Sequence, residues 1–132
     1  MTDPTPQERR ARGLARMSEV YGFDVSDGPG DQFAHTADQL FGEVWTREGL
    51  SDRDRRLLLF GALGAAGLDD VVALQAGAAL ANGEVDADQL REIALFLTYY
   101  IGWPLGTKVE FAVGKAISDH RRKLRDAEKK DS

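Results

Sequence analysis

The chain has 132 residues, of which 42% are hydrophobic and 30% charged, and its formal net charge is −5. This length and apolar content suit a single domain with a modest core. The acidic balance disfavours a general nucleic-acid binder, because phosphate contacts need clustered Lys and Arg. The chain has no cysteine, which excludes disulfides, thiolate metal sites and thiol-based peroxidase chemistry.

Hydropathy argues against a membrane protein. The longest apolar run, from Leu57 to Leu68, is shorter than the ~20 residues that a bilayer-spanning helix needs. The N-terminal stretch from Met1 to Arg16 is polar and lacks the apolar segment of a signal peptide. We therefore expect a cytoplasmic protein with no membrane partner.

The first third of the chain has the pattern of two helices separated by a loop. Leu14, Met17 and Tyr21 recur at helical spacing, and Gly22 is a plausible stop. Residues 24–30 are rich in Asp, Ser, Gly and Pro, which is typical of a loop. The stripe of an amphipathic helix follows. Its apolar positions are Phe33, Ala37, Leu40, Phe41 and Val44.

Two further helices are predicted between residues 51 and 83. Ser51 followed by Asp54 resembles a capping box, and the apolar run behind it is long for a strand and indicates a buried helix. Asp69 places negative charge at the next helix start, where the helix dipole favours it. That helix is expected to end at Asn82 and Gly83.

Two helices complete the prediction. Asp86 can cap the first of them, whose tail over residues 93–101 is apolar almost all round and is expected to be central to the fold. Gly102 ends this helix, and Pro104 suits the first turn of the last one, which becomes a solvated or frayed helix over residues 121–130. No segment alternates apolar and polar residues as a strand does, so the chain is predicted to be all-α.

The amount of apolar surface on these helices raises the question of self-association. The faces of residues 57–66 and 93–101 together exceed what one small domain usually hides, and their Gly and Ala content lets helices approach closely. A tightly packed monomer and an oligomer are both compatible with this pattern.

Two groups of short motifs carry a family resemblance. They are Gly42-Glu43-Val44-Trp45, Gly49-Leu50-Ser51 and Asp54-Arg55-Arg56-Leu57-Leu58 in the first group, and Ala78-Ala79-Leu80-Ala81-Asn82-Gly83, Glu92 and Tyr100-Ile101-Gly102-Trp103-Pro104 in the second. Together they resemble the carboxymuconolactone decarboxylase family over roughly residues 9–117. The resemblance implies an alkylhydroperoxidase D-like domain of about six helices, spanning residues 1–132 with its core near 33–117. It also implies a homotrimer or a homohexamer.

The resemblance further implies a reaction. Family members remove carbon dioxide from a carboxylated unsaturated lactone in aromatic-acid catabolism, so a small anionic substrate is the expected partner and no cofactor is needed. Such an enzyme stabilises a developing oxyanion and delivers a proton to carbon. In the related peroxidase branch the two motif cysteines would fall on Leu68 and Val71. The peroxidase activity therefore has no nucleophile here.

Glu43, Arg55 and Gln75 are the candidate catalytic residues. A carboxylate beside an indole, as Glu43 is beside Trp45 in sequence, is partly desolvated and suited to proton transfer. An exposed Glu at a helix terminus is the alternative. Arg55 matches the family's arginine and can clamp a substrate carboxylate, although neighbouring aspartates could simply compensate its charge. Arg56 falls at a position that varies among relatives.

Gln75 stands where the family usually has a histidine, a natural acid–base group. Glutamine can hydrogen-bond an oxyanion or a carboxylate, but it cannot carry a proton between them. It could equally be a buried amide satisfied by backbone groups. Two hypotheses stay open: a decarboxylase that works without the histidine, and a non-catalytic oligomeric relative that binds a small acidic metabolite.

Trp45, Tyr100 and Trp103 are the candidate substrate-binding residues. Tyr100 matches the family's pocket wall and can donate a hydrogen bond to a lactone oxygen, and Trp103 replaces a smaller apolar residue there. Phe96 is expected to be core. The two histidines of the chain, His35 and His120, have no second histidine at ligand spacing, so no metal site is expected.

Overall fold

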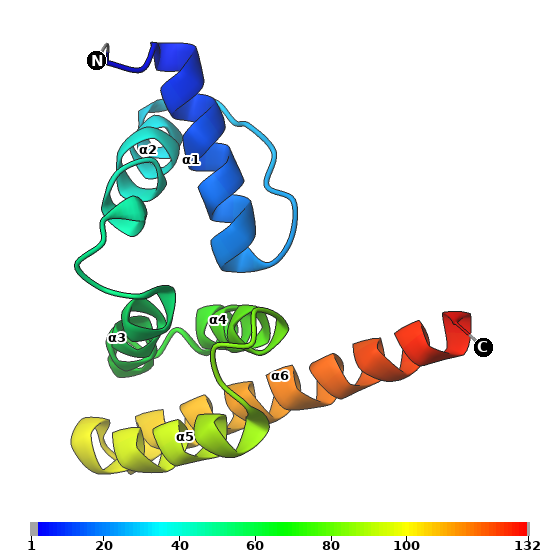
Figure 1. The fold of residues 1–132 in the computed structure, drawn as a ribbon. Helices are drawn as coiled ribbons and strands as arrows, with labels where there is room; N and C mark the ends of the chain where they lie inside the picture. Colours follow the sequence, from blue (N-terminus) through cyan, green and yellow to red (C-terminus); the bar gives the residue numbers. More distant parts are fainter. Residues whose placement is uncertain (1–2, 132) are drawn as a thin grey trace. The chain divides into compact units, whose positions relative to one another are not determined.

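The computed structural model describes residues 3–131, and every regular element among them is a helix (Figure 1). The all-α prediction is therefore confirmed. The chain divides into two compact units, Met1–Asp52 (unit 1) and Arg53–Ser132 (unit 2). No helix in the described part of the chain is long and apolar enough to cross a membrane.

Unit 1 begins with α1 (Pro6–Tyr21). The Thr5 hydroxyl caps its first turn by accepting a hydrogen bond from the backbone N–H of Glu8 at 3.1 Å. Gly22 ends it in the left-handed conformation with φ 80°, a geometry that favours glycine. The predicted stop at Gly22 is confirmed.

The prediction of one regular amphipathic helix over residues 33–44 is wrong. The segment contains a short α2 (Asp31–Ala34), a π-helical η1 (His35–Phe41) and a 3₁₀ turn, η2 (Val44–Thr46). The wide turn of η1 closes with a hydrogen bond from the N–H of Gly42 to the carbonyl of Ala37 at 3.0 Å. This wider pitch breaks the 3.6-residue register, so Ala37 and Phe41 stay buried while Leu40 and Val44 become exposed.

The backbone of α1 is in direct contact with the backbone of η1. A Cβ added to Gly13 would lie 1.8 Å from the carbonyl oxygen of Ala37, which is itself fully buried. Any side chain at position 13 would therefore push the two elements apart. Arg10 joins the same two elements by donating from Nε to Oδ1 of Asp38 at 2.6 Å.

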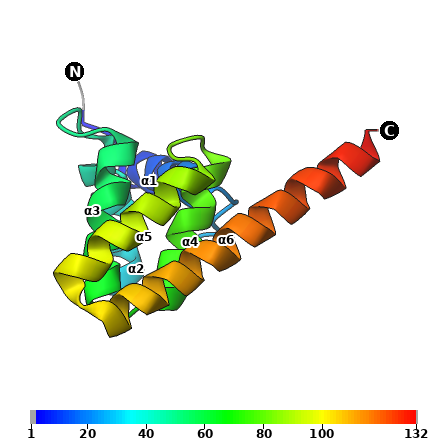
Figure 2. The same cartoon turned by 90° about the horizontal axis from the view of Figure 1, so that it is seen from below.

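Unit 2 consists of four helices: α3 (Asp52–Ala65), α4 (Asp69–Ala81), α5 (Ala87–Ile101) and α6 (Trp103–Lys130). Helices α5 and α6 lie side by side, as Figure 2 shows. The core is apolar and draws on all four helices. Its fully buried large side chains include Phe60, Val72, Leu90, Val109 and Val113.

The helix boundaries of unit 2 follow the predicted signals. Asp86 and Gln89 form a reciprocal capping box at the start of α5. Gly102, with φ 96°, separates α5 from α6, and Pro104 lies in the first turn of α6. The tail over residues 121–130 is a regular continuation of α6 (Figures 1 and 2). All of its side chains are exposed.

The expectation that residues 93–101 are central to the fold is wrong for one side of this helical segment, which is exposed. Ala94 and Thr98 are buried, but Phe96 is 63% exposed rather than core, and Tyr99 and Tyr100 are more than 70% exposed. The reason is that α5 lies at the edge of unit 2, where its partners cover only one face.

Candidate functional site

Among the residues that the structure describes, the most deeply buried charged group is the guanidinium of Arg56. Arg56 of α3 is fully buried and donates from Nε to Oε1 of Glu84 at 2.9 Å and from Nη2 to Oε2 at 3.1 Å. Its Nη1 donates to Oε1 of Gln75 on α4 at 2.5 Å. We call Arg56, Gln75 and Glu84 the Arg56 cluster. It joins α3, α4 and the turn after α4 through one side chain.

Local structure explains how each member arrives there. Arg56, Phe60 and Gly64 follow one another at four-residue spacing and form the buried face of α3. Glu84 follows Gly83, whose positive φ of 70° ends α4. The N–H of Glu84 donates to the carbonyl of Ala79 at 2.9 Å, which completes a Schellman motif and turns the chain back toward α3.

The positive charge of Arg56 is balanced within the Arg56 cluster. A buried guanidinium is costly unless it is paired, and the two-pronged contact with Glu84 supplies a carboxylate of matching geometry. Within residues 3–131, no buried side-chain nitrogen or oxygen lacks a hydrogen-bond partner. The cluster is thus a neutral, hydrogen-bonded unit that fixes the side chain of Gln75.

Gln75 keeps donor capacity within this arrangement. Its oxygen accepts from Arg56, so its amide nitrogen points its two N–H groups elsewhere. That nitrogen forms no hydrogen bond with any residue that the structure describes, and because no enclosed side-chain nitrogen there lacks a partner, it is accessible to solvent. Gln75 therefore keeps the capacity to donate a hydrogen bond to an oxygen of another molecule.

The arginine that contacts Gln75 is Arg56 and not Arg55, the one that the sequence motif favours. Arg55 is only half-buried, whereas Arg56 is completely enclosed. One signal in the sequence could have identified Arg56: it precedes Phe60 by four residues, which places it on the apolar face of the predicted helix. Glu84 carried no comparable signal, because its position depends on the turn after α4.

Glu43 and Trp45 both belong to unit 1. The side chain of Glu43 is 58% exposed and lies 3.6 Å from Nη1 of Arg47. Trp45 is buried and stacks on Phe41, with ring centroids 5.7 Å apart. Its indole therefore packs in the core of the unit and does not shield the Glu43 carboxylate from water.

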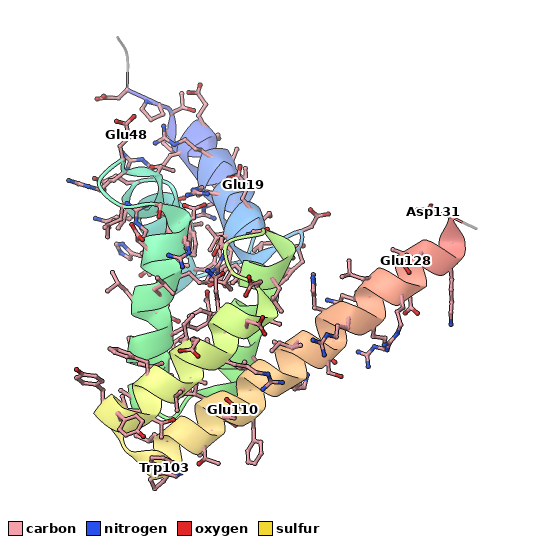
Figure 3. The ribbon with its side chains drawn as sticks, turned by 60° about the horizontal axis from the view of Figure 1, so that its bottom comes forward. Glu19, Glu48, Trp103, Glu110, Glu128 and Asp131 are labelled. Carbon is pink, nitrogen blue, oxygen red and sulfur yellow. The ribbon has the colours of Figure 1, made fainter. Side chains whose placement is uncertain are left out.

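Tyr100 lies in the last turn of α5. Trp103 is the first residue of α6 and lies where the two helices meet (Figure 3). This junction packs on the C-terminal end of α3, since a Cβ at Gly64 would lie 3.3 Å from Cδ1 of Ile101. Arg56 is two turns earlier on α3, about 12 Å along the helix axis at 1.5 Å per residue. Unit 2 therefore does not bring Tyr100 or Trp103 to the Arg56 cluster.

Comparison with known proteins identifies the family that this chain resembles. Residues 31–112 match the model of the carboxymuconolactone decarboxylase family. A protein of Acinetobacter baylyi (strain ATCC 33305 / BD413 / ADP1) that is named 4-carboxymuconolactone decarboxylase is 38% identical over 106 residues, which cover 74% of this chain and 78% of that protein. No solved structure matches the chain.

Proposed function

This chain belongs to the carboxymuconolactone decarboxylase family, and on that premise we propose that it decarboxylates a small, carboxylated, unsaturated lactone or a related acid without a cofactor. The observation that carries this proposal is the 38% identity to 4-carboxymuconolactone decarboxylase over most of both chains. A place in aromatic-acid catabolism is part of the same proposal.

The reaction defines what the protein has to supply. The bond between the carboxylate carbon and the ring breaks, carbon dioxide leaves, and the electron pair moves through the conjugated ring onto the lactone carbonyl. A proton is then added to carbon. Placed hydrogen-bond donors at such an oxyanion contribute ~3–4 kcal/mol each, and a placed general acid gives about 10²–10⁴-fold in rate.

In this proposal Gln75 is the donor to the lactone oxygen. Its amide nitrogen is available because Arg56 occupies the amide oxygen. Arg55 binds the substrate carboxylate, and Glu43 transfers the proton. Unit 2 does not bring Tyr100 or Trp103 to the amide donor, and Trp45 packs in the core of unit 1, so the proposal that these three residues line the substrate rests on the family resemblance alone. The roles of all these residues other than Gln75 rest on their match to the family motifs.

A second candidate function is binding of a small acidic metabolite without catalysis. It is favoured by Gln75 itself, which replaces the usual histidine and cannot transfer a proton. The two charges of the Arg56 cluster also neutralise each other, so this cluster offers no unpaired acid or base. The decarboxylase proposal therefore depends on a proton donor outside the cluster.

A spectrophotometric assay with γ-carboxymuconolactone separates the two. The wild-type protein is compared with Gln75→His, which introduces an acid–base group, and with Gln75→Leu, which removes the amide. We expect turnover by the wild type, a higher kcat for Gln75→His and a loss of at least tenfold for Gln75→Leu. Activity in Gln75→His alone would support the non-catalytic function of the natural chain. No turnover by any of the three would contradict the decarboxylase proposal for this lactone.

We also propose that the chain is a homo-oligomer, a trimer or a hexamer as the family resemblance implies. The supporting observation is a set of exposed aromatic side chains on the α5–α6 pair, which we call the aromatic surface. Its members are Phe96, Tyr99, Tyr100, Trp103 and Phe111, each 62–76% exposed.

The size of the aromatic surface favours a second copy as its partner. Since aromatic residues bury 150–250 Å² each, five at this exposure present roughly 700 Å², close to the ~800 Å² that each partner contributes to a standard interface. Charge favours association between copies through a different part of the chain. The final turns of α6 carry six basic and two acidic residues (121–130) in a chain of net charge −5, so the remainder of a second copy is strongly acidic.

A further inference from the structure

Unit 1 contains a polar cleft to which the proposed decarboxylation gives no role apart from that of Glu43, one of its lining residues. It lies between α1 and η1 and has a volume of about 480 Å³, within the range of small-molecule sites. The polar side chains that line it are Arg9, Arg12, His35, Asp38, Gln39 and Glu43. We propose that this cleft binds a small organic carboxylate, held by the guanidinium groups of Arg9 and Arg12.

The two arginines differ from the others of unit 1 in their pairing. Arg10, Arg16 and Arg47 each form an ion pair with a carboxylate of the same unit. Within the described residues, neither Arg9 nor Arg12 forms a hydrogen bond or an ion pair with a side chain. The cleft therefore contains two guanidinium groups whose donors are available to a ligand.

The two carboxylates in the lining do not cancel this positive charge. Asp38 accepts two hydrogen bonds from Arg10, at 2.6 and 3.3 Å, and Glu43 lies 3.6 Å from Arg47. Each carboxylate is thus paired with an arginine that does not line the cleft, and Arg10 is shared between Asp38 and Asp27. With these partners counted, four arginines face three carboxylates, so the cleft keeps a net positive charge that favours an anion.

The walls of the cleft are fixed before any ligand binds. The backbone contact between Gly13 and Ala37 locks α1 against η1, and the pairing of Arg10 with Asp38 lies beside it. A preformed site of this kind loses little free energy to ordering on binding. One wall is also π-helical, a rare conformation that frequently accompanies functional sites.

The spacing of the donors selects the ligand class. Arg9 and Arg12 are three residues apart on α1, so their Cβ atoms are ~5–6 Å apart and both guanidinium groups reach one carboxylate. Planar guanidinium forks match the geometry of a carboxylate. His35 and Gln39 present further hydrogen-bonding groups from the opposite wall, where a hydroxyl or carbonyl of an organic acid can bind.

The test is an NMR titration of the full ¹⁵N-labelled chain with malate, repeated with inorganic phosphate. The variant pair Arg9→Gln/Arg12→Gln removes two charges from the cleft. The pair Arg91→Gln/Arg125→Gln removes two charges from exposed helix positions of unit 2 and is the matched control. None of these measurements depends on decarboxylation, so the result is independent of the proposed function.

We expect saturable shifts of backbone amides in residues 9–12 and 35–43, with malate binding weakened at least tenfold in Arg9→Gln/Arg12→Gln and unchanged in the control pair. Equal weakening in both pairs would overturn the proposal, because it would show a general charge effect. Shifts that do not saturate would overturn it too. Phosphate binding as tightly as malate would overturn the assignment to a carboxylate.

Discussion

The amide oxygen of Gln75 accepts a hydrogen bond from Nη1 of the fully buried Arg56. This contact decides which end of the glutamine faces Arg56 and which end keeps available donors. It also ties the residue at the family's usual histidine position to an ion pair, because the same guanidinium binds Glu84. The polar centre of unit 2 is thus a three-residue assembly, and its stability and its chemistry can be tested separately.

Glu84→Gln is expected to destabilise the protein strongly. The substitution leaves the buried charge of Arg56 without its carboxylate, and breaking a buried pair in this way costs ~3–5 kcal/mol. Urea unfolding, followed by circular dichroism, measures the loss. Glu110→Gln is the matched control, because it breaks the exposed pair with Arg91, where about 0–1 kcal/mol is expected. Equal effects of the two substitutions would show that the Arg56 cluster does not stabilise the fold.

Gly13→Ala is expected to destabilise unit 1 by ~1–3 kcal/mol. The methyl group of the new alanine would overlap the carbonyl of Ala37 and force α1 away from η1. Gly114→Ala is the control: it is also a helical glycine, but a Cβ there meets no atom within 4 Å. Since alanine is the better helix former, Gly114→Ala is expected to be neutral or to stabilise by up to about 1 kcal/mol. Thermal unfolding distinguishes the two outcomes, and a neutral Gly13→Ala would contradict the close packing.

Acid is expected to weaken the contact between α1 and η1. The hydrogen bonds from Arg10 hold the pKa of Asp38 below its usual value, and the charges of Arg10, Arg9 and His35 act in the same direction. A carboxyl whose pKa is lower in the folded state stabilises the fold above its unfolded pKa, near 3.8. That contribution is lost as the pH falls through the lower, folded value.

The measurement for this pH dependence is the free energy of unfolding of the wild type and of Asp38→Asn between pH 2 and 6. We expect the difference between the two proteins to be constant above about pH 5 and to shrink at lower pH. A difference that stays the same down to pH 2 would show that Asp38 does not titrate with folding.

Substitution within the aromatic surface is expected to change the oligomeric state. Phe111→Glu and Tyr100→Glu place a charge at positions that are at least 75% exposed, so the folded chain should tolerate them. An oligomer that uses this surface would have to bury that charge and should dissociate. Sedimentation velocity should show a multiple of 14.5 kDa for the wild type and a smaller species for the variants.

Leu50→Glu is the control for this experiment, because it changes a half-exposed leucine in unit 1 that lies outside the aromatic surface. It is expected to keep the wild-type mass. A monomeric wild type would contradict the oligomer proposal. Wild-type mass in both aromatic variants would show that the copies associate through another face.

Local signals determined the positions of several helix ends in this chain. Gly22 and Gly102 stop helices because they adopt positive φ, and Asp86 starts α5 because its carboxylate satisfies a free N–H of the first turn. Such interactions involve residues only a few positions apart, so they can be recognised in the sequence. The motifs from Gly42 to Pro104 likewise predicted the family that the comparisons show.

Only the tertiary structure decided which side chains meet and which stay exposed. The helical pattern of residues 33–44 gave no sign of η1, whose wide turn accompanies the contact between Gly13 and Ala37. Phe96 is apolar in sequence and exposed in the fold, because α5 lies at the edge of unit 2. Spacing in the sequence places Arg56 on the buried face of its helix, but its pairing with Gln75 and Glu84 depends on how α3, α4 and the turn at Glu84 pack. The sequence shows the local conformational preference of each segment and the tendency of each residue to be buried. Contacts between residues far apart in the chain depend on how the helices pack.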